Sequence, residues 1–112
     1  MSALQIQFQD TAHSTAVVER IESKYQRLER ICGTILSCRV VVAQPHRHQR
    51  KGRLYHVSIE LSEPRKTYVA HTEADRPEHE DVYAAIRECF DAVARQVHDE
   101  HRRRRDLQRV VA

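Results

Sequence analysis

Two short stretches of the chain are rich in arginine, lysine and histidine and contain almost no acidic residues. One covers residues 46–53 and the other is the arginine run at 102–105. A guanidinium group can bind two phosphate oxygens at once and can stack on an unpaired base. Stretches rich in arginine therefore suit the binding of a nucleic acid. The residues predicted to contact phosphate in these stretches are Arg47, Arg50, Lys51, Arg53, Arg102, Arg103, Arg104 and Arg105. The plain alternatives are a solvated hairpin loop and a frayed, solvated tail.

A third group of cations occurs at helical spacing. Arg20, Lys24 and Arg27 fall on one flank of a predicted helix, whereas Glu22 and Glu29 fall on the opposite flank. Mixed charges on a solvated helix usually serve solubility alone. Because the two signs are segregated here, we favour a basic flank that reaches successive phosphates of a nucleic acid.

Neither a metal site nor a catalytic site is expected. His46 and His48 form an HxH pair, and His98 and His101 lie three residues apart, but no HExxH, CxxC or carboxylate cluster completes a zinc site. The chain has only two glycines and lacks GxSxG and phosphate-loop motifs. We therefore predict a protein that is not an enzyme, needs no cofactor and has no small-molecule substrate, in which histidines add hydrogen bonds or charge at an RNA surface.

Length, charge and cysteine usage narrow the class of protein. The 112 residues suffice for one domain, and the net charge of +3 hides a polarised distribution, since acids gather at 73–81. Cys32, Cys38 and Cys89 are odd in number and lack a CxxC pair, so they are expected to be free and buried. With no secretory segment and no membrane-spanning run, the protein is expected to be cytoplasmic and without membrane contact.

Hydrophobic periodicity predicts six elements. They are a strand over 4–9, a helix from an N-cap at Ser14 or Thr15 to Gly33, strands over 35–43, 54–61 and 66–72, and a helix over 81–105. A turn is expected at 62–65. Crossover rules make the first two strands parallel and the last three an antiparallel meander. The predicted fold is an α+β two-layer sandwich in the order β-α-β-β-β-α, with both helices on one face of a four-stranded sheet. It forms a single domain, 1–105, followed by a short tail, 106–112.

The last helix carries both a core-facing stripe and a charged face. Arg87 and Asp91, and Asp91 and Arg95, are four residues apart, which predicts ion pairs on its outer side. The acids just before it, Glu78, Glu80 and Asp81, are predicted to cap its first turn.

Two segments resemble a known family. The stretch KYQRLER (24–30), and DVYAAI (81–86) followed by ARQV (94–97), are similar to motifs of the bacterial ribosome hibernation-promoting factors and ribosome-associated translation inhibitors, also called sigma-54 modulation proteins. The resemblance covers nearly the whole chain and corresponds to the short form of the family.

The resemblance implies binding to the small ribosomal subunit between its head and body, where the decoding region used by mRNA and tRNA would be blocked. It implies that Lys24, Arg27 and Arg95 face ribosomal RNA and that Asp81, Tyr83 and Ile86 are motif positions, partly structural for Tyr83. Ala92 departs from the family, which often has lysine there. Similarity to the short form leads us to expect no C-terminal dimerisation domain of the kind found in long members, no pairing of ribosomes by that route, and a monomer off the ribosome.

Two other functions remain open from the sequence. A sheet with two helices on one face also suits a general structured-RNA-binding module, and the sigma-54 label suggests a protein-interaction regulator. Whether such a protein preserves single ribosomes or promotes their dimers with a partner factor is also left open.

Overall fold

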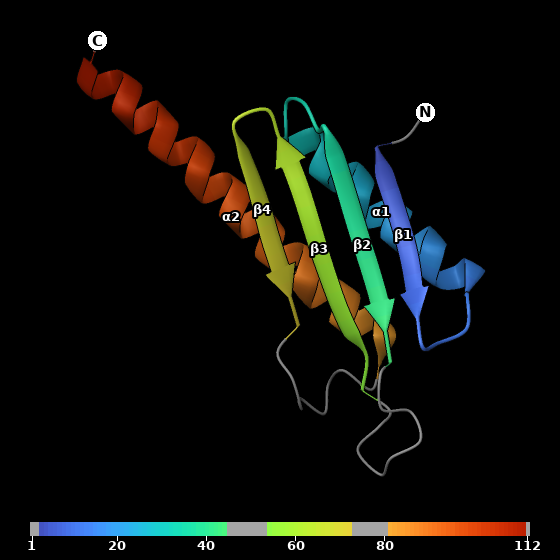
Figure 1. The fold of residues 1–112 in the computed structure, drawn as a ribbon. Helices are drawn as coiled ribbons and strands as arrows, with labels where there is room; N and C mark the ends of the chain where they lie inside the picture. The colour runs from blue at the N-terminus through green and yellow to red at the C-terminus, as the bar shows by residue number, and fades with distance from the viewer. Residues whose placement is uncertain (1–2, 45–53, 73–80, 112) are drawn as a thin grey trace.

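The computed structural model describes residues 3–44, 54–72 and 81–111, without the side chain of residue 111. Six elements follow one another: β1 (Leu4–Gln9), α1 (Thr15–Ile31), β2 (Ser37–Ala43), β3 (His56–Glu63), β4 (Lys66–His71) and α2 (Val82–Val111). The strands form one sheet in the order β1-β2-β3-β4, with β1 parallel to β2 and the other pairs antiparallel. Both helices cover the same face of this sheet (Figure 1). The predicted fold class and topology are confirmed.

The first helix begins at the predicted cap but ends by a different device. The Ser14 side chain accepts a hydrogen bond from the backbone N–H of Val17 at 3.3 Å, so Ser14 is the N-cap. At the other end the N–H of Cys32 donates to the carbonyl of Leu28 at 2.8 Å, and Cys32 turns into extended backbone. Gly33 follows without a positive φ, so the helix does not stop through a left-handed glycine.

The turn predicted at 62–65 is shorter in the structure. Ser62 and Glu63 continue β3, where they pair with Thr67 and Lys66, and only residues 64 and 65 form the turn. The Ser62 carbonyl also accepts a hydrogen bond from the N–H of Leu36 at 2.8 Å, so long-range pairing extends the strand. As a result Glu63 enters the sheet with its side chain turned inward.

A single hydrophobic core lies between the sheet and the helices. Alternate residues of the strands point into it, and one stripe of each helix closes it. Its fully buried members include Ile21, Leu28, Val40, Val42, Val57, Ile59, Leu61, Ile86, Val93 and Val97. Burial of each such side chain contributes about 1.5–3 kcal/mol. All three cysteines are free and buried here, as predicted, and burial raises the pKa of each thiol to about 12.

The second helix is longer than predicted. It has 30 residues, which corresponds to about 45 Å, whereas the longest strand has 8 residues and spans about 26 Å. The helix therefore runs past the sheet, and its last turns project alone from the body (Figure 1). Among the described residues, no helix has the length and apolar character needed to cross a membrane.

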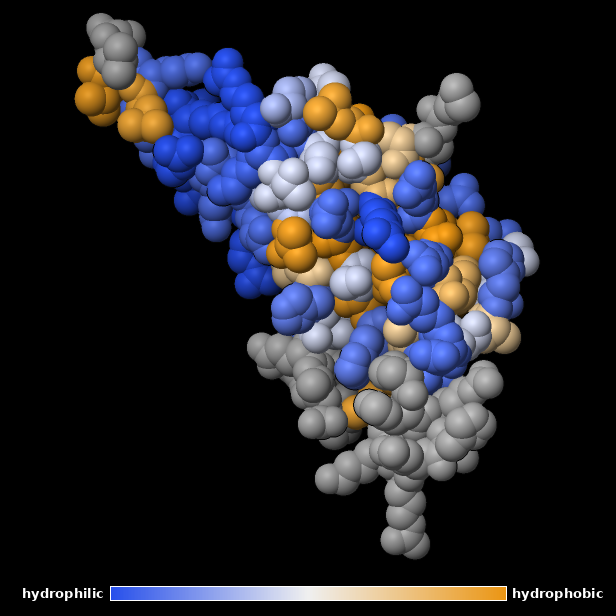
Figure 2. Space-filling model, in the orientation of Figure 1, coloured by the Kyte–Doolittle hydropathy of each residue, from blue (hydrophilic) through white to orange (hydrophobic). Residues whose placement is uncertain are grey.

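The other face of the sheet is not covered by any described element. Figure 2 looks onto this face, where hydrophilic and hydrophobic side chains are intermixed. Arg39 lies on it, and its guanidinium donates to the side-chain oxygen of Gln7 at 2.8 Å. Val69 is also on this face and is 54% exposed. The molecule thus has two faces of different chemistry, one made by helices and one by strands.

Candidate nucleic-acid interface

The basic flank of α1 faces α2. The guanidinium of Arg20 lies 4.8 Å from the centre of the Tyr83 ring, at the start of α2. Near the opposite end of α1, Arg30 and Ile31 share a groove with His98 of α2. The two helices are therefore parallel, and the flank that carries Arg20 follows the length of their junction.

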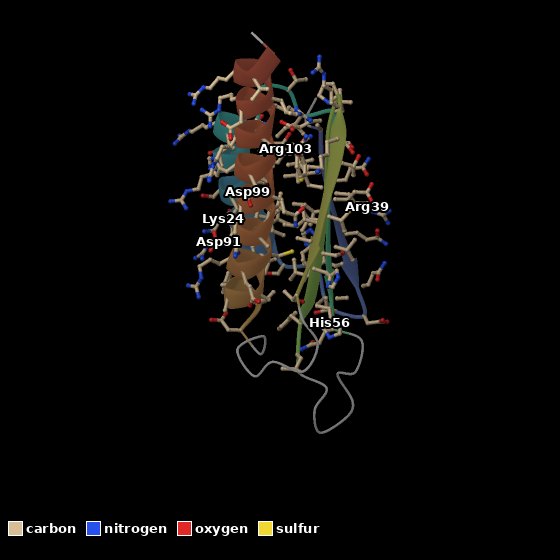
Figure 3. The ribbon with its side chains drawn as sticks, turned by 90° about the vertical axis from the view of Figure 1, so that its left-hand side faces the viewer. Lys24, Arg39, His56, Asp91, Asp99 and Arg103 are labelled. Carbon is tan, nitrogen blue, oxygen red and sulfur yellow. The ribbon has the colours of Figure 1, made fainter. Side chains whose placement is uncertain are left out.

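Four cations line this junction on its solvent side, and we call them the basic seam. They are Arg20, Lys24 and Arg27 from α1 and Arg87 from α2, which lies one turn after Tyr83. Arg20, Arg27 and Arg87 are exposed, and Lys24 is half-buried. Figure 3 shows Lys24 on the helix side of the molecule and Arg39 on the sheet side. The seam therefore presents its charge to a partner that approaches the helix layer.

The ion pairs predicted on the outer side of α2 do not form. Asp91 makes no ion pair with Arg87 or Arg95, and among the described residues no carboxylate pairs with either arginine. An ion pair between exposed side chains gains little Coulomb energy and costs side-chain entropy. The side chains of Arg87, Asp91 and Arg95 therefore stay in solvent without pairing with one another. This prediction was wrong. Because Arg87 and Arg95 pair with no described carboxylate, their positive charge is available to a ligand.

Arg95 lies apart from the seam. It is exposed on α2, but it is turned about 80° around the helix from Arg87, away from α1. The family resemblance implied that Arg95, like Lys24 and Arg27, faces ribosomal RNA. In the structure Arg95 lies on the outer side of α2 and is not part of the seam.

Most of the arginine run is tied to acids of the same helix. Arg103 pairs with Glu100 at 2.7 Å, Arg104 pairs with Glu100 at 3.2 Å, and Arg102 lies 3.8 Å from Asp99. The run is helical, not a frayed tail. Of its four arginines, only Arg105 has no carboxylate partner among the described residues.

Glu100 is the shared ion-pair partner of the basic side chains at this end of the helix. It is 7% exposed and also pairs with Lys66 of β4 at 3.3 Å, which joins α2 to the hairpin. The hydrogen bonds from Arg103, helped by Lys66, hold the pKa of Glu100 at about 2. Arg103 and Arg104 therefore have a structural role, and part of their charge is already neutralised.

A second buried acid sits beside the first. The Tyr68 hydroxyl donates to Oε1 of Glu63 at 2.8 Å, and Nε2 of His101 lies 3.0 and 3.2 Å from the two oxygens of that carboxylate. An ionised carboxylate only accepts, so Nε2 of His101 carries the proton. Burial, followed by the hydrogen bond to Glu63, raises the pKa of Tyr68. Glu63 thus fixes the ring of His101 at the helix junction.

The motif residues have structural roles. Oδ1 of Asp81 accepts the N–H of Tyr83 at 2.9 Å, which confirms the cap predicted for Asp81. Ile86 is fully buried in the core. Ala92, at the position where the family often has lysine, is half-buried and packs against the core. A side chain at this position faces β4 and not the seam.

Some predicted residues lie outside the described part of the chain. These are Arg47, Arg50, Lys51 and Arg53, the HxH histidines His46 and His48, and the predicted capping residues Glu78 and Glu80. Within residues 3–44, 54–72 and 81–111, no group of three or more His, Cys, Asp or Glu side chains converges as metal ligands.

Two cations of the candidate interface were not predicted from the sequence. Arg30 and Arg87 lie at the helix junction but were not selected as RNA contacts. Arg30 is three residues after Arg27, and Arg87 is four after Tyr83, so the helical period contained the signal. What was lacking was the parallel packing of the two helices, which only the structure provides.

Comparison with known proteins agrees with this architecture. The family model described as sigma-54 modulation protein / S30EA ribosomal protein matches residues 4–105. The chain belongs to this family. Membership in this ribosome-associated family supports ribosome binding and a role in translation regulation. No curated protein sequence matches the chain significantly.

Solved structures share the fold of this sigma-54 modulation/S30EA member at low identity. The N-terminal domain of Protein Y from Thermus thermophilus superposes with a TM-score of 0.65 at 20% identity, covering 84% of this chain and 93% of that one. A ribosomal subunit interface protein from Coxiella burnetii gives a TM-score of 0.70 at 18% identity, covering 88% of this chain and 96% of that one. At these identities the likeness establishes the fold of the family member.

Proposed function

We propose that this protein binds the small ribosomal subunit at the decoding region through its helix layer, and inhibits translation by excluding mRNA and tRNA. The observation that carries the proposal is the basic seam, within a chain that belongs to a ribosome-associated family. Three of its four cations are exposed, Lys24 is half-buried, and none of the four pairs with a described carboxylate, so their charges are available to phosphates. Inhibition by occlusion needs no catalysed reaction and no cofactor.

The opposite face of the molecule supports this orientation. The outer side of the sheet mixes apolar and polar residues, and Arg39 there is already hydrogen-bonded to Gln7. A polyanion is attracted more strongly to the helix layer, because several cations lie in a row there. We therefore propose that the sheet faces away from the ribosomal RNA, and that the protein acts as a cytoplasmic monomer that docks on the ribosome.

The binding face can be tested with two variants of equal charge change. Lys24→Gln with Arg27→Gln removes two cations from the helix layer, and Arg39→Gln with Arg65→Gln removes two from the sheet side and the β3–β4 turn. We expect co-sedimentation with small subunits to fall for the first variant and to persist for the second. Equal binding by both variants would show that the helix layer is not the binding face.

The decoding-region site requires a competition measurement. Bound protein should be displaced by mRNA together with tRNA, and wild-type protein should reduce peptide synthesis in a purified translation system. A general structured-RNA-binding module would instead bind unrelated duplex RNA with the same affinity and would not compete with tRNA. A protein-interaction regulator would remain bound to its target after nuclease treatment.

A further inference from the structure

An open groove lies at the end of the helix junction, beyond the basic seam. It has a volume of about 570 Å³ and is lined by Arg30, Ile31, His98, His101, Arg104 and Arg105. Volumes of 300–1,000 Å³ are typical of sites that hold small organic ligands, so the groove is large enough for one nucleotide. None of its lining residues is acidic.

The charge of the groove comes mainly from two guanidinium groups. Arg30 of α1 and Arg105 of α2 are exposed, and neither pairs with a carboxylate in the described part of the chain. Arg104 contributes less, because its Nε already donates to Glu100 at 3.2 Å. Two guanidinium groups on neighbouring helices can hold one phosphate by bidentate hydrogen bonds from two sides.

The floor of the groove suits a planar group. Ile31 is half-buried and apolar, and the imidazole rings of His98 and His101 line the same space. The ring of His101 is held in place because its Nε2 donates to the carboxylate of Glu63 at 3.0 Å. An unpaired base stacks on imidazole, guanidinium and apolar surfaces, whereas a base inside a duplex cannot reach them.

We propose that this groove binds one unpaired nucleotide of RNA, with its phosphate on Arg30 and Arg105 and its base against the imidazoles and Ile31. This inference rests on the proposed function and adds to it. The seam would contact the RNA backbone without regard to pairing, whereas the groove would require a nucleotide turned out of its helix. The ligand class is therefore a single-stranded or bulged ribonucleotide.

The direct test uses the full chain and three fluorescent probes. They are an adenylate hexamer, an abasic ribose-phosphate hexamer of equal length, and a short double-stranded RNA. We expect the hexamer to bind roughly tenfold more tightly than its abasic counterpart, because base stacking is lost in the latter. Equal affinity for the two hexamers, or no measurable hexamer binding, would overturn the proposal.

Variants locate the site. Arg30→Gln with Arg105→Gln should weaken hexamer binding roughly tenfold, because the phosphate loses its charged hydrogen bonds. The charge-matched control, Arg39→Gln with Arg65→Gln, should bind as the wild type does. Unfolding midpoints of both variants should match the wild type, since these side chains are exposed. Equal loss in the groove variant and its control would contradict a specific site.

The two proposals can fail separately. If Lys24→Gln with Arg27→Gln abolishes small-subunit binding while the groove variant retains wild-type hexamer affinity, the groove proposal is wrong and the proposed function stands. If the seam variant still binds subunits normally, the proposed function fails. The nucleotide preference of the groove is then judged by the hexamer measurements alone.

Discussion

The guanidinium of Arg20 lies over the ring of Tyr83, 4.8 Å from its centre, and this contact joins the start of α1 to the start of α2. At this contact the basic flank of α1 faces the junction between the two parallel helices. Tyr83 belongs to the DVYAAI motif, so one motif residue positions the first cation of the basic seam.

This contact predicts different outcomes for two substitutions of Tyr83. Tyr83→Phe retains an aromatic face and should leave the free energy of unfolding unchanged. Tyr83→Leu removes the cation–π interaction and should lower the free energy of unfolding by about 0.5–1 kcal/mol. Urea titrations of both variants provide the measurement, and an equal effect of the two substitutions would show that the interaction contributes nothing.

Salt dependence should report on the basic seam. Each cation that neutralises a phosphate adds about 0.7–0.9 to the slope of log affinity against log salt. Lys24→Gln with Arg27→Gln should therefore reduce the slope for small-subunit binding by about 1.4–1.8. Titrations from low to high potassium chloride measure this slope. Arg39→Gln with Arg65→Gln is the control, and an equal reduction there would mean that the cations act only through net charge.

The depressed pKa of Glu100 predicts acid sensitivity. Its pKa falls from an ordinary value of 4.5 to about 2 through Arg103 and Lys66. A carboxyl with a lowered pKa in the folded state contributes stability above its unfolded pKa and loses it as the pH falls. The stability from Glu100 should thus be present above pH 4.5 and disappear between pH 4.5 and about 2.

Glu100→Gln isolates this contribution. The variant should be less stable than the wild type at neutral pH, and the difference between the two should shrink between pH 4.5 and 2. Denaturant unfolding at a series of pH values measures it. A difference that stays constant with pH would rule out the ionised Glu100 as its source.

The hydroxyl of Tyr68 should contribute more to the free energy of unfolding than the hydroxyl of Tyr25, another buried tyrosine. Tyr68→Phe removes a 2.8 Å hydrogen bond to the Glu63 carboxylate and should cost about 1.5–3 kcal/mol of stability. Tyr25 is buried to a similar degree, but its hydroxyl has no hydrogen-bond partner among the described residues. Tyr25→Phe is therefore the matched control and should be near neutral. Similar losses for both would indicate that ring packing, not the bond to Glu63, is responsible.

Local patterns predicted the elements and the topology well. Residues such as Ile21 and Val93 recur at the helical period, and the residues of β3 alternate, so the inward faces follow from the sequence. Connection rules then gave the parallel and antiparallel pairs. Ser14 and Asp81 also cap their helices as expected, because a cap is a contact between near neighbours.

The candidate interface was predicted less completely, because its geometry depends on contacts between residues that are far apart in the sequence. His101 meets Glu63 across 38 positions, and Lys66 meets Glu100 across 34. The helical and strand periods relate only residues that are close in sequence, so they cannot predict such pairs. The arginine run resembled a solvated anchor in the sequence, but Arg103 and Arg104 pair with Glu100 one turn earlier, within a helix that continues to Val111.

The burial of every cysteine has a practical consequence for observing the protein at work. All three thiols are enclosed in the core, and with a pKa of about 12 each stays protonated near neutral pH, so maleimide dyes should leave the folded chain unlabelled. A single cysteine introduced at exposed Ser37, at the start of β2, would then be the one labelled position. A dye there would sit on the strand layer and could follow docking in real time while the helix layer remains untouched.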